Sequence, residues 1–217
     1  MKLRPKRLGA GATLVALGCL AAIVYSASTA SAWRRSQPAL QGAEAKPSSI
    51  ALAVDPAQST LHWTLDSSLH TVHGTFAIKS GKFELTTEGH SVSGEIRVDP
   101  ASGESGNQSR DNRMHKEILD VSRFTEVIFR AQTFDGKLST TAPADLQLQG
   151  TLALHGSDHP ITVPVHLELT GDHWKGSAKL QLPYVEWGLK DPSNFLLKAA
   201  KVVDIEVMLA GNLQQTH

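Results

Sequence analysis

The stretch LQLQGTLAL, residues 146–154, decides the fold class of this chain. Leucine or glycine stands at every even position, and glutamine, threonine or alanine stands between them. Successive side chains of a β-strand point to opposite faces, whereas a helix places its apolar residues three and four positions apart. The two-residue period therefore predicts a strand with one buried face and one face in water.

The same period recurs on both sides of this stretch. Apolar residues alternate over residues 61–65, 76–85, 92–98, 127–131, 161–169, 174–182 and 203–209, with short turns between most of these runs. Together these runs indicate about eight or nine strands without a strand–helix–strand rhythm, which is typical of an all-β antiparallel sandwich or barrel. A closed sheet of about eight strands is either filled by its own side chains or holds one small ligand. No boundary interrupts the pattern after about residue 50, so we predict one domain.

One segment, residues 103–124, breaks the two-residue period with the sequence GESGNQSRDNRMHKEILDVSRF. Met114 and Ile118 lie four apart with charged residues on the other side, which is the spacing of a short amphipathic helix. Asp111 is expected to cap the first turn of this helix. Arg110 is then free to brace the helix or to pair with an anion. The segment is a plug, a lid or a crossover.

Residues 1–32 have the pattern of an export signal or a membrane anchor. Four basic residues within the first seven precede an apolar run over residues 8–25, and Ala30-Ser31-Ala32 resembles a cleavage site. The apolar run is also long enough to remain in the membrane as a tether. Cys19 alternatively resembles the acylated cysteine of a lipoprotein. Each outcome exports the domain, and residues 33–49 are predicted to form a linker.

The charge of the chain argues against a nucleic-acid partner. The whole chain has 21 Lys and Arg and 21 Asp and Glu, but residues 1–32 contain four of the cations and none of the acids. The remainder has 17 cations against 21 acids, a formal net charge of −4. Nucleic-acid binding depends on clustered Lys and Arg. Because the one cysteine lies within residues 1–32, we also expect no disulfide in the exported domain.

Candidate catalytic patterns are few. The sequence contains no G-x-S-x-G, P-loop, G-x-G-x-x-G or H-E-x-x-H motif. His70 and His73 have a spacing that can reach one metal ion. One alternative is therefore a metal-binding or hydrolytic module that uses His70, His73 and His115 with Asp111. Another is a structural β-domain of the cell envelope with a filled core.

Several short motifs follow one another over roughly residues 50–212. They are Asp55-Pro56-Ala57-Gln58-Ser59, His70-Thr71-Val72-His73-Gly74-Thr75-Phe76, Ser109-Arg110-Asp111 ahead of Met114-His115, Gly150-Thr151-Leu152-Ala153-Leu154-His155-Gly156, Pro160-Ile161-Thr162-Val163-Pro164-Val165 and Trp187-Gly188-Leu189. Their order and spacing resemble the YceI-like family of bacterial exported lipid-binding proteins. The resemblance implies an all-β fold: a single lipocalin-like antiparallel barrel of about eight strands with one short helix. It further implies a hydrophobic tube for a polyisoprenoid chain, such as a quinone side chain or a polyprenyl phosphate, in a periplasmic or secreted protein.

On this resemblance we predict non-enzymatic binding, transport or storage of a long apolar lipid, with no cofactor. The side chains expected to line the tube are Trp63, Leu65, Phe76, Ile78, Phe129, Leu152 and Leu154. Arg110, with His70 or His115, is expected at the polar end, where a head group would lie. We favour a lid over that end for residues 103–124. The oligomeric state is left open, a dimer included.

Overall fold

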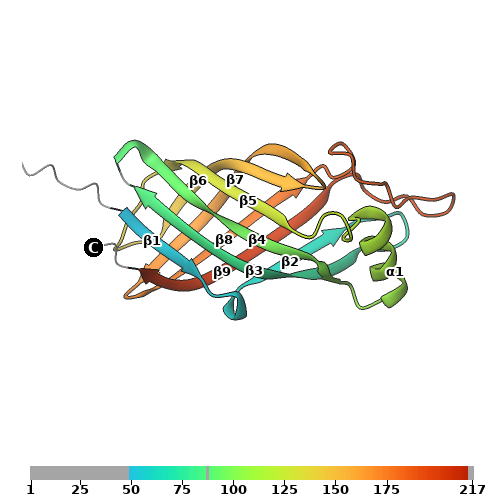
Figure 1. The fold of residues 1–217 in the computed structure, drawn as a ribbon, viewed down its shortest axis with the longest axis horizontal. Coiled ribbons are helices and arrows are strands. Elements are labelled where there is room, and N and C mark those ends of the chain that lie inside the picture. The colour runs from blue at the N-terminus through green and yellow to red at the C-terminus, as the bar shows by residue number, and fades with distance from the viewer. Residues whose placement is uncertain (1–48, 87, 215–217) are drawn as a thin grey trace, which may run out of the picture. The chain divides into compact units, whose positions relative to one another are not determined.

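The strands predicted from the alternating pattern are present and pair into one sheet (Figure 1). The computed structural model describes residues 49–86 and 88–214. Its strands are β1 (Ser49–Val54), β2 (Thr60–Leu65), β3 (Val72–Thr86), β4 (Ser91–Glu104), β5 (Val127–Gly136), β6 (Ala144–Leu154), β7 (Ser157–Thr170), β8 (His173–Leu182) and β9 (Val203–Gln214). The predicted export segment, its apolar run over residues 8–25 and all but the last residue of the predicted linker lie outside the described residues.

The sheet closes on itself. Its order is β1-β3-β2-β9-β8-β7-β6-β5-β4, all neighbours are antiparallel, and β3 also pairs with β4. Strands β1 and β2 both lie between β3 and β9, separated by the 3-10 turn η1 (Pro56–Gln58), so they act as one interrupted strand. The barrel therefore has eight strand positions, which confirms the predicted fold class.

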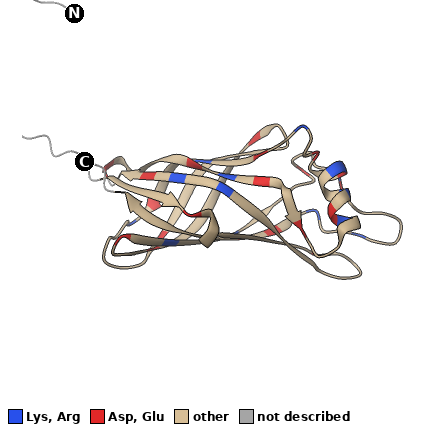
Figure 2. Cartoon of the chain, turned by 60° about the horizontal axis from the view of Figure 1, so that its bottom comes forward, with Lys and Arg blue, Asp and Glu red and all other residues tan. Residues whose placement is uncertain are grey.

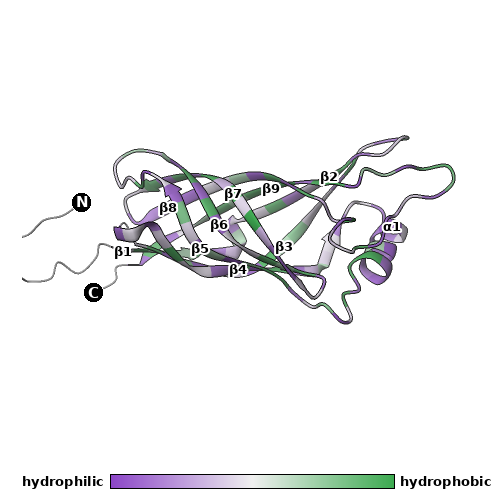
Figure 3. Cartoon of the chain, turned by 90° about the horizontal axis from the view of Figure 1, so that it is seen from above, coloured by the Kyte–Doolittle hydropathy of each residue, from purple (hydrophilic) through white to green (hydrophobic). Residues whose placement is uncertain are grey.

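Strand β6 contains the stretch LQLQGTLAL, and its alternating residues lie on opposite faces of the sheet. Its buried residues include Leu146, Gly150 and Leu152, while Gln147 and Gln149 between them are exposed. The same alternation of apolar and polar residues is visible along the other strands (Figure 3). At Gly150 a Cβ atom would lie 2.8 Å from the ring of Phe129 and 2.2 Å from the carbonyl oxygen of Arg130, so this close approach requires glycine.

The predicted helical interruption is present, with a different cap and an extra irregularity. It consists of α1 (Gln108–Arg113) followed by a π-helical turn, η3 (Met114–Ile118). The expectation that Asp111 caps the helix is wrong, because the cap is Asn107, whose side chain accepts a hydrogen bond from the Arg110 backbone N–H at 3.0 Å. Asp111 lies one turn further on and accepts a hydrogen bond from the Ser105 hydroxyl instead. Among the described residues, no helix is long and apolar enough to cross a membrane.

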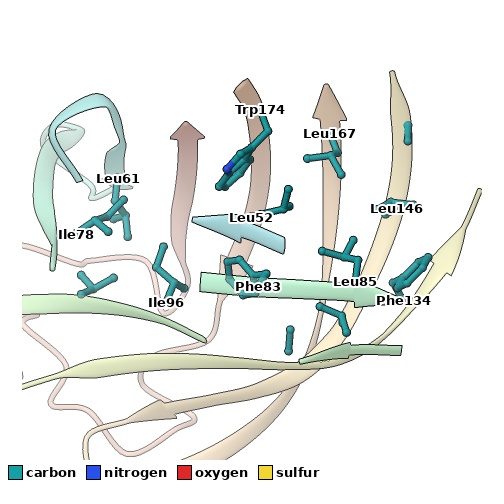
Figure 4. Packing of buried hydrophobic residues seen from close by; sticks show 14 residues of the cluster. Leu52, Leu61, Ile78, Phe83, Leu85, Ile96, Phe134, Leu146, Leu167 and Trp174 are labelled. Carbon is teal, nitrogen blue, oxygen red and sulfur yellow. The ribbon is translucent and has the colours of Figure 1, made fainter. Parts of the chain in front are cut away.

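The end of the barrel away from α1 is packed with large side chains (Figures 1 and 4). Phe134 and Leu146 are almost completely buried there, and Phe83, Leu85 and Trp174 belong to the same cluster. The Trp174 indole N–H donates to the carbonyl oxygen of Ala53 at 3.0 Å, which satisfies the polar atom of a buried ring. Large buried side chains therefore gather at this end of the barrel.

Phe134→Ala tests this packed end. Phe134 is 1% exposed, so we expect the substitution to lower the free energy of unfolding by about 3–5 kcal/mol. Urea denaturation followed by circular dichroism measures the change. Phe195→Ala is the matched control, because Phe195 is 94% exposed and its loss should change stability by less than about 0.5 kcal/mol. Equal effects of the two substitutions would contradict the packing described here.

Candidate functional site

The barrel encloses a cavity of about 420 Å³. All nine strands contribute lining side chains, and nearly all of these are aliphatic or aromatic. The volume lies within the range of roughly 300–1,000 Å³ that is typical of small-molecule sites. A wall with so few hydrogen-bonding groups favours an apolar occupant over water.

The few polar side chains that line the cavity gather at one end. Ser67 and His70 come from the loop between β2 and β3, Arg110 and Arg113 from α1, and Asn194 from the loop between β8 and β9. These segments lie together at the α1 end of the barrel (Figure 1). The sixth polar residue of the lining, Ser177, is on β8. We call the α1 end of the barrel the mouth.

The helical segment covers part of the mouth. Arg110, Arg113, Met114, Ile118 and Leu119 from this segment all line the cavity. The last backbone bond of the π turn, from Leu119 N to Met114 O at 2.9 Å, keeps these apolar side chains on the side of the barrel. This arrangement fits the lid predicted from the sequence better than a simple crossover does.

A small hydrogen-bond network holds Arg110 at the lid. Its Nε donates to the Ser105 hydroxyl at 2.7 Å, and its Nη2 donates to the Ser105 carbonyl oxygen at 2.8 Å. Ser105 in turn donates to Asp111. In the described part of the chain no carboxylate forms an ion pair with Arg110. The guanidinium is therefore braced through Ser105 and keeps donor capacity for an anion at the cavity.

A second contact joins the lid to the long loop between β8 and β9. Lys190 Nζ lies 2.6 Å from Glu117 Oε2, and Arg113 Nε lies 3.5 Å from the same oxygen. The hydrogen bond and the charge of Lys190 hold the pKa of the Glu117 carboxyl below its ordinary value, with a smaller contribution from Arg113. This ion pair fastens the lid to the opposite side of the mouth.

The same loop packs into a separate apolar cluster below the lid. Tyr184 and Leu189 are buried there with Leu152 and Leu154, and Ile118 of the lid packs against them. The Tyr184 hydroxyl donates to the carbonyl oxygen of Ala200 at 2.8 Å, and burial raises the pKa of this phenol. The aromatic loop therefore supports the lid from the barrel side.

Comparison with known proteins agrees with this architecture. The model of the YceI-like domain matches residues 52–212. The chain belongs to the YceI-like family. No curated protein matches its sequence.

Two solved structures resemble this YceI-like barrel. One is a polyisoprenoid-binding domain from Saccharophagus degradans implicated in plant cell wall breakdown, with 15% identity, a TM-score of 0.61, and coverage of 78% of this chain and 100% of that chain. The other is BcnA from Burkholderia cenocepacia, with 18% identity, a TM-score of 0.61, and coverage of 73% and 99%. At these identities the similarity establishes the shared fold.

Most residues predicted as ligand contacts face the cavity of the YceI-like barrel. The eight that line it are Trp63, Leu65, His70, Phe76, Arg110, Phe129, Leu152 and Leu154. That they bind a ligand stays a prediction. Ile78 and His115 do not line the cavity. Ile78 is buried within the core cluster, beside a shift in the β3–β4 register, and the His115 Nε2–H donates to the Gly103 carbonyl oxygen at 2.8 Å.

Several residues of the site were absent from the sequence-based set. Met114, Ile118 and Leu119 line the cavity, although their spacing was used only to predict a helix. Tyr184 and Leu189 also line the cavity, but no regular spacing in their segment shows which side chains turn inward. The signal that could have identified Asn107 is its residue type directly ahead of the helix.

The alternative metal site lacks a ligand set. His73 Nδ1 lies 3.0 Å from the Thr64 hydroxyl, and His115 is engaged by Gly103. Within residues 49–86 and 88–214, no group of three or more His, Cys, Asp or Glu side chains could hold a metal ion. The alternative of a filled core is contradicted by the cavity.

Glu117→Gln tests the ion pair that fastens the lid. Because the folded pKa of Glu117 is lowered, the contribution of this pair is complete above the ordinary carboxyl pKa of about 4.3. The contribution is lost as the pH falls through the lowered pKa. At pH 7 we expect faster amide hydrogen exchange over residues 107–119 in Glu117→Gln, and the difference between variant and parent should shrink as the pH falls through the lowered pKa. Glu186→Gln removes an exposed carboxylate from the neighbouring loop and should leave lid exchange unchanged.

Proposed function

We propose that this YceI-like domain binds a long apolar lipid of the polyisoprenoid type, with the hydrocarbon chain in the barrel and the head group at the mouth. The observation that carries the proposal is the cavity wall, which is apolar along all nine strands and polar almost only at one end. Removal of hydrocarbon from water contributes about 25 cal/mol per Å² of buried apolar surface. Such a wall can therefore retain a chain without specific polar contacts.

The mouth supplies chemistry for a polar or anionic head group. Arg110 and Arg113 line this end, and Arg110 has no carboxylate partner among the described residues. A guanidinium presents several donors in a plane, which matches a phosphate or a quinone oxygen. His70 lies on the same lining and can donate or accept a hydrogen bond. The ligand would enter with its tail directed toward the packed end.

We infer that the domain binds and carries its ligand and does not transform it. The lining residues in the described part of the chain include no Asp, Glu or Cys, so the cavity wall offers neither a paired carboxylate nor a thiol nucleophile. Transport or storage in the cell envelope, in the periplasm or as a secreted protein, follows from the export pattern of residues 1–32. This assignment of location rests on the sequence.

Ligand identity is tested by purification from the native membranes. We expect native mass spectrometry of the full chain, followed by organic extraction, to reveal a bound isoprenoid. Ala178→Trp should reduce loading at least about tenfold, because Ala178 lines the cavity and indole would occupy the space of the ligand. Lys179→Trp places the same side chain on the exposed outer face of β8 and should load normally. Thermal melts show whether both variants are folded, and equal loading of two folded variants would contradict the proposal.

Arg110→Ala separates a head-group contact from a brace. We expect this variant to lose its preference for a fluorescent polyprenyl phosphate over the matching alcohol by about tenfold or more, since a charge-assisted hydrogen bond is removed. Ser105→Ala is the control, because it removes the hydroxyl through which Ser105 joins Arg110 to Asp111 and keeps the guanidinium and its bond to the Ser105 carbonyl oxygen. Both variants should loosen the lid, so a similar loss of phosphate preference in both would assign Arg110 a bracing role only.

A further inference from the structure

The mouth carries an apolar projection that the interior of the barrel does not use. Of the five large hydrophobic side chains exposed in the described part of the chain, Leu69 is 66%, Phe195 94% and Leu196 76% exposed. Leu69 lies between β2 and β3, and Phe195 and Leu196 lie between β8 and β9. We call these three residues the mouth tip. Isolated exposed leucines are ordinary, but three such residues on two joined loops indicate an interaction site.

The two loops that carry the mouth tip are joined and ordered. Ser68 N donates to the Lys198 carbonyl oxygen at 2.8 Å, and Lys198 N donates to the Ser68 hydroxyl at 3.1 Å. Asn194 Oδ1 accepts from the backbone N–H groups of Leu196 and Leu197 at 2.9 Å each. The apolar side chains are therefore presented by a hydrogen-bonded turn.

These loops face the cavity on their other side. Ser67 and His70 line the cavity on one loop, and Asn194, Leu197 and Ala199 line it on the other. The orange-red loop projects beyond the barrel at the α1 end (Figure 1), and a part of it is apolar (Figure 3). The mouth tip therefore lies on the same two loops that line the entrance of the cavity.

The charge of the mouth differs from that of the barrel. Residues 49–214 contain 14 Lys and Arg against 20 Asp and Glu, a net charge of −6. Residues 66–71 and 183–202, which form the two loops, contain three lysines against three acids, a net charge of 0. The lid over residues 107–120 is neutral, with three charges of each sign. Most of the acidic surplus therefore lies along the barrel, away from the projecting loops (Figure 2).

Lys198 adds an unpaired cation beside the mouth tip. Lys190 and Lys201 pair with Glu117 and Asp191, whereas no ion pair with Lys198 occurs among the described residues. An exposed apolar tip flanked by a free cation has the composition of a segment that enters the head-group region of an anionic bilayer.

We propose that the mouth docks on an anionic phospholipid bilayer, with Leu69, Phe195 and Leu196 inserted among the lipid head groups. In this orientation the cavity entrance lies against the membrane, so a lipid chain passes between bilayer and barrel without crossing water. The proposal deepens the lipid-carrier function and rests on it for the role of the docking. The docking itself depends only on the mouth tip and its charge.

Site-directed spin labels test the docking in the full chain. The label is placed by Phe195→Cys or, as a matched control on the outer barrel wall, by Met208→Cys, where Met208 is 47% exposed. Both carry Cys19→Ser, which leaves a single thiol. Vesicles of phosphatidylethanolamine and phosphatidylglycerol are added, and collisions with oxygen and with a water-soluble nickel complex are measured. Because each label reports its own surroundings, the result does not depend on how residues 1–48 behave.

The expected result is local. The label at residue 195 should gain oxygen accessibility and lose nickel accessibility on vesicles, while the label at residue 208 should stay in water. Replacing both Leu69 and Leu196 by Ser should weaken vesicle contact of the residue 195 label about tenfold or more, because two side chains lose their burial in the bilayer. Lys198→Gln, or vesicles of phosphatidylcholine alone, should weaken it by a smaller factor.

Other occupants of the mouth tip give different signals. Spin–spin broadening between labels at residue 195 would indicate a second copy of this chain and would overturn membrane docking. A label that stays in water on vesicles would also overturn it. Binding of the fluorescent polyprenyl phosphate is measured on the same labelled chains. Loss of probe binding refutes the carrier function, whereas a probe-loaded protein whose residue 195 label remains in water refutes only the docking.

Discussion

Closure of the sheet through the β3–β4 pairing is the constraint on which the rest of the structure depends. A closed sheet has no free edge, and it forces one face of every strand to turn inward. The inward faces are apolar throughout, but large side chains such as Phe134 and Trp174 gather at one end. The side chains do not fill the whole interior, which contains a cavity of about 420 Å³. A cavity is therefore a consequence of how bulky residues are distributed along the strands.

The two ends of the barrel are stabilised by different interactions. The packed end depends on buried apolar contact, which is large and does not depend on the ionisation of side chains. The lid depends on hydrogen bonds and on the exposed Glu117–Lys190 pair, and exposed ion pairs contribute little to stability. Regions of this kind open at a lower free energy than the core does. Under the proposed function, such an opening of the lid would admit a ligand without unfolding the barrel.

Much of the fold could be predicted from the sequence, because burial of one face of each strand places apolar residues at every second position. The cavity-facing residues on β2, β5 and β6 follow the same rule. Prediction failed where a local irregularity decides the outcome. Ile78 lies beside register shifts between β3 and β4. Such shifts cannot be recognised from the alternation of odd and even positions along one strand. Asn107 and Asp111 are both residue types that cap helices. The helix α1 begins at Gln108, directly after Asn107, so Asn107 is the cap. The mouth tip depends on two loops that are more than a hundred residues apart in the chain.

The cavity has a packed end and a mouth, and this difference relates the core, the lid and the mouth tip to one another. In the proposed binding mode a lipid chain enters through the mouth, and its head group lies beside Arg110, which lines that end of the cavity. Transfer of such a ligand through water would expose its hydrocarbon, at a cost proportional to the exposed area. An apolar rim outside a polar ring removes that barrier, because the chain exchanges one apolar environment for another.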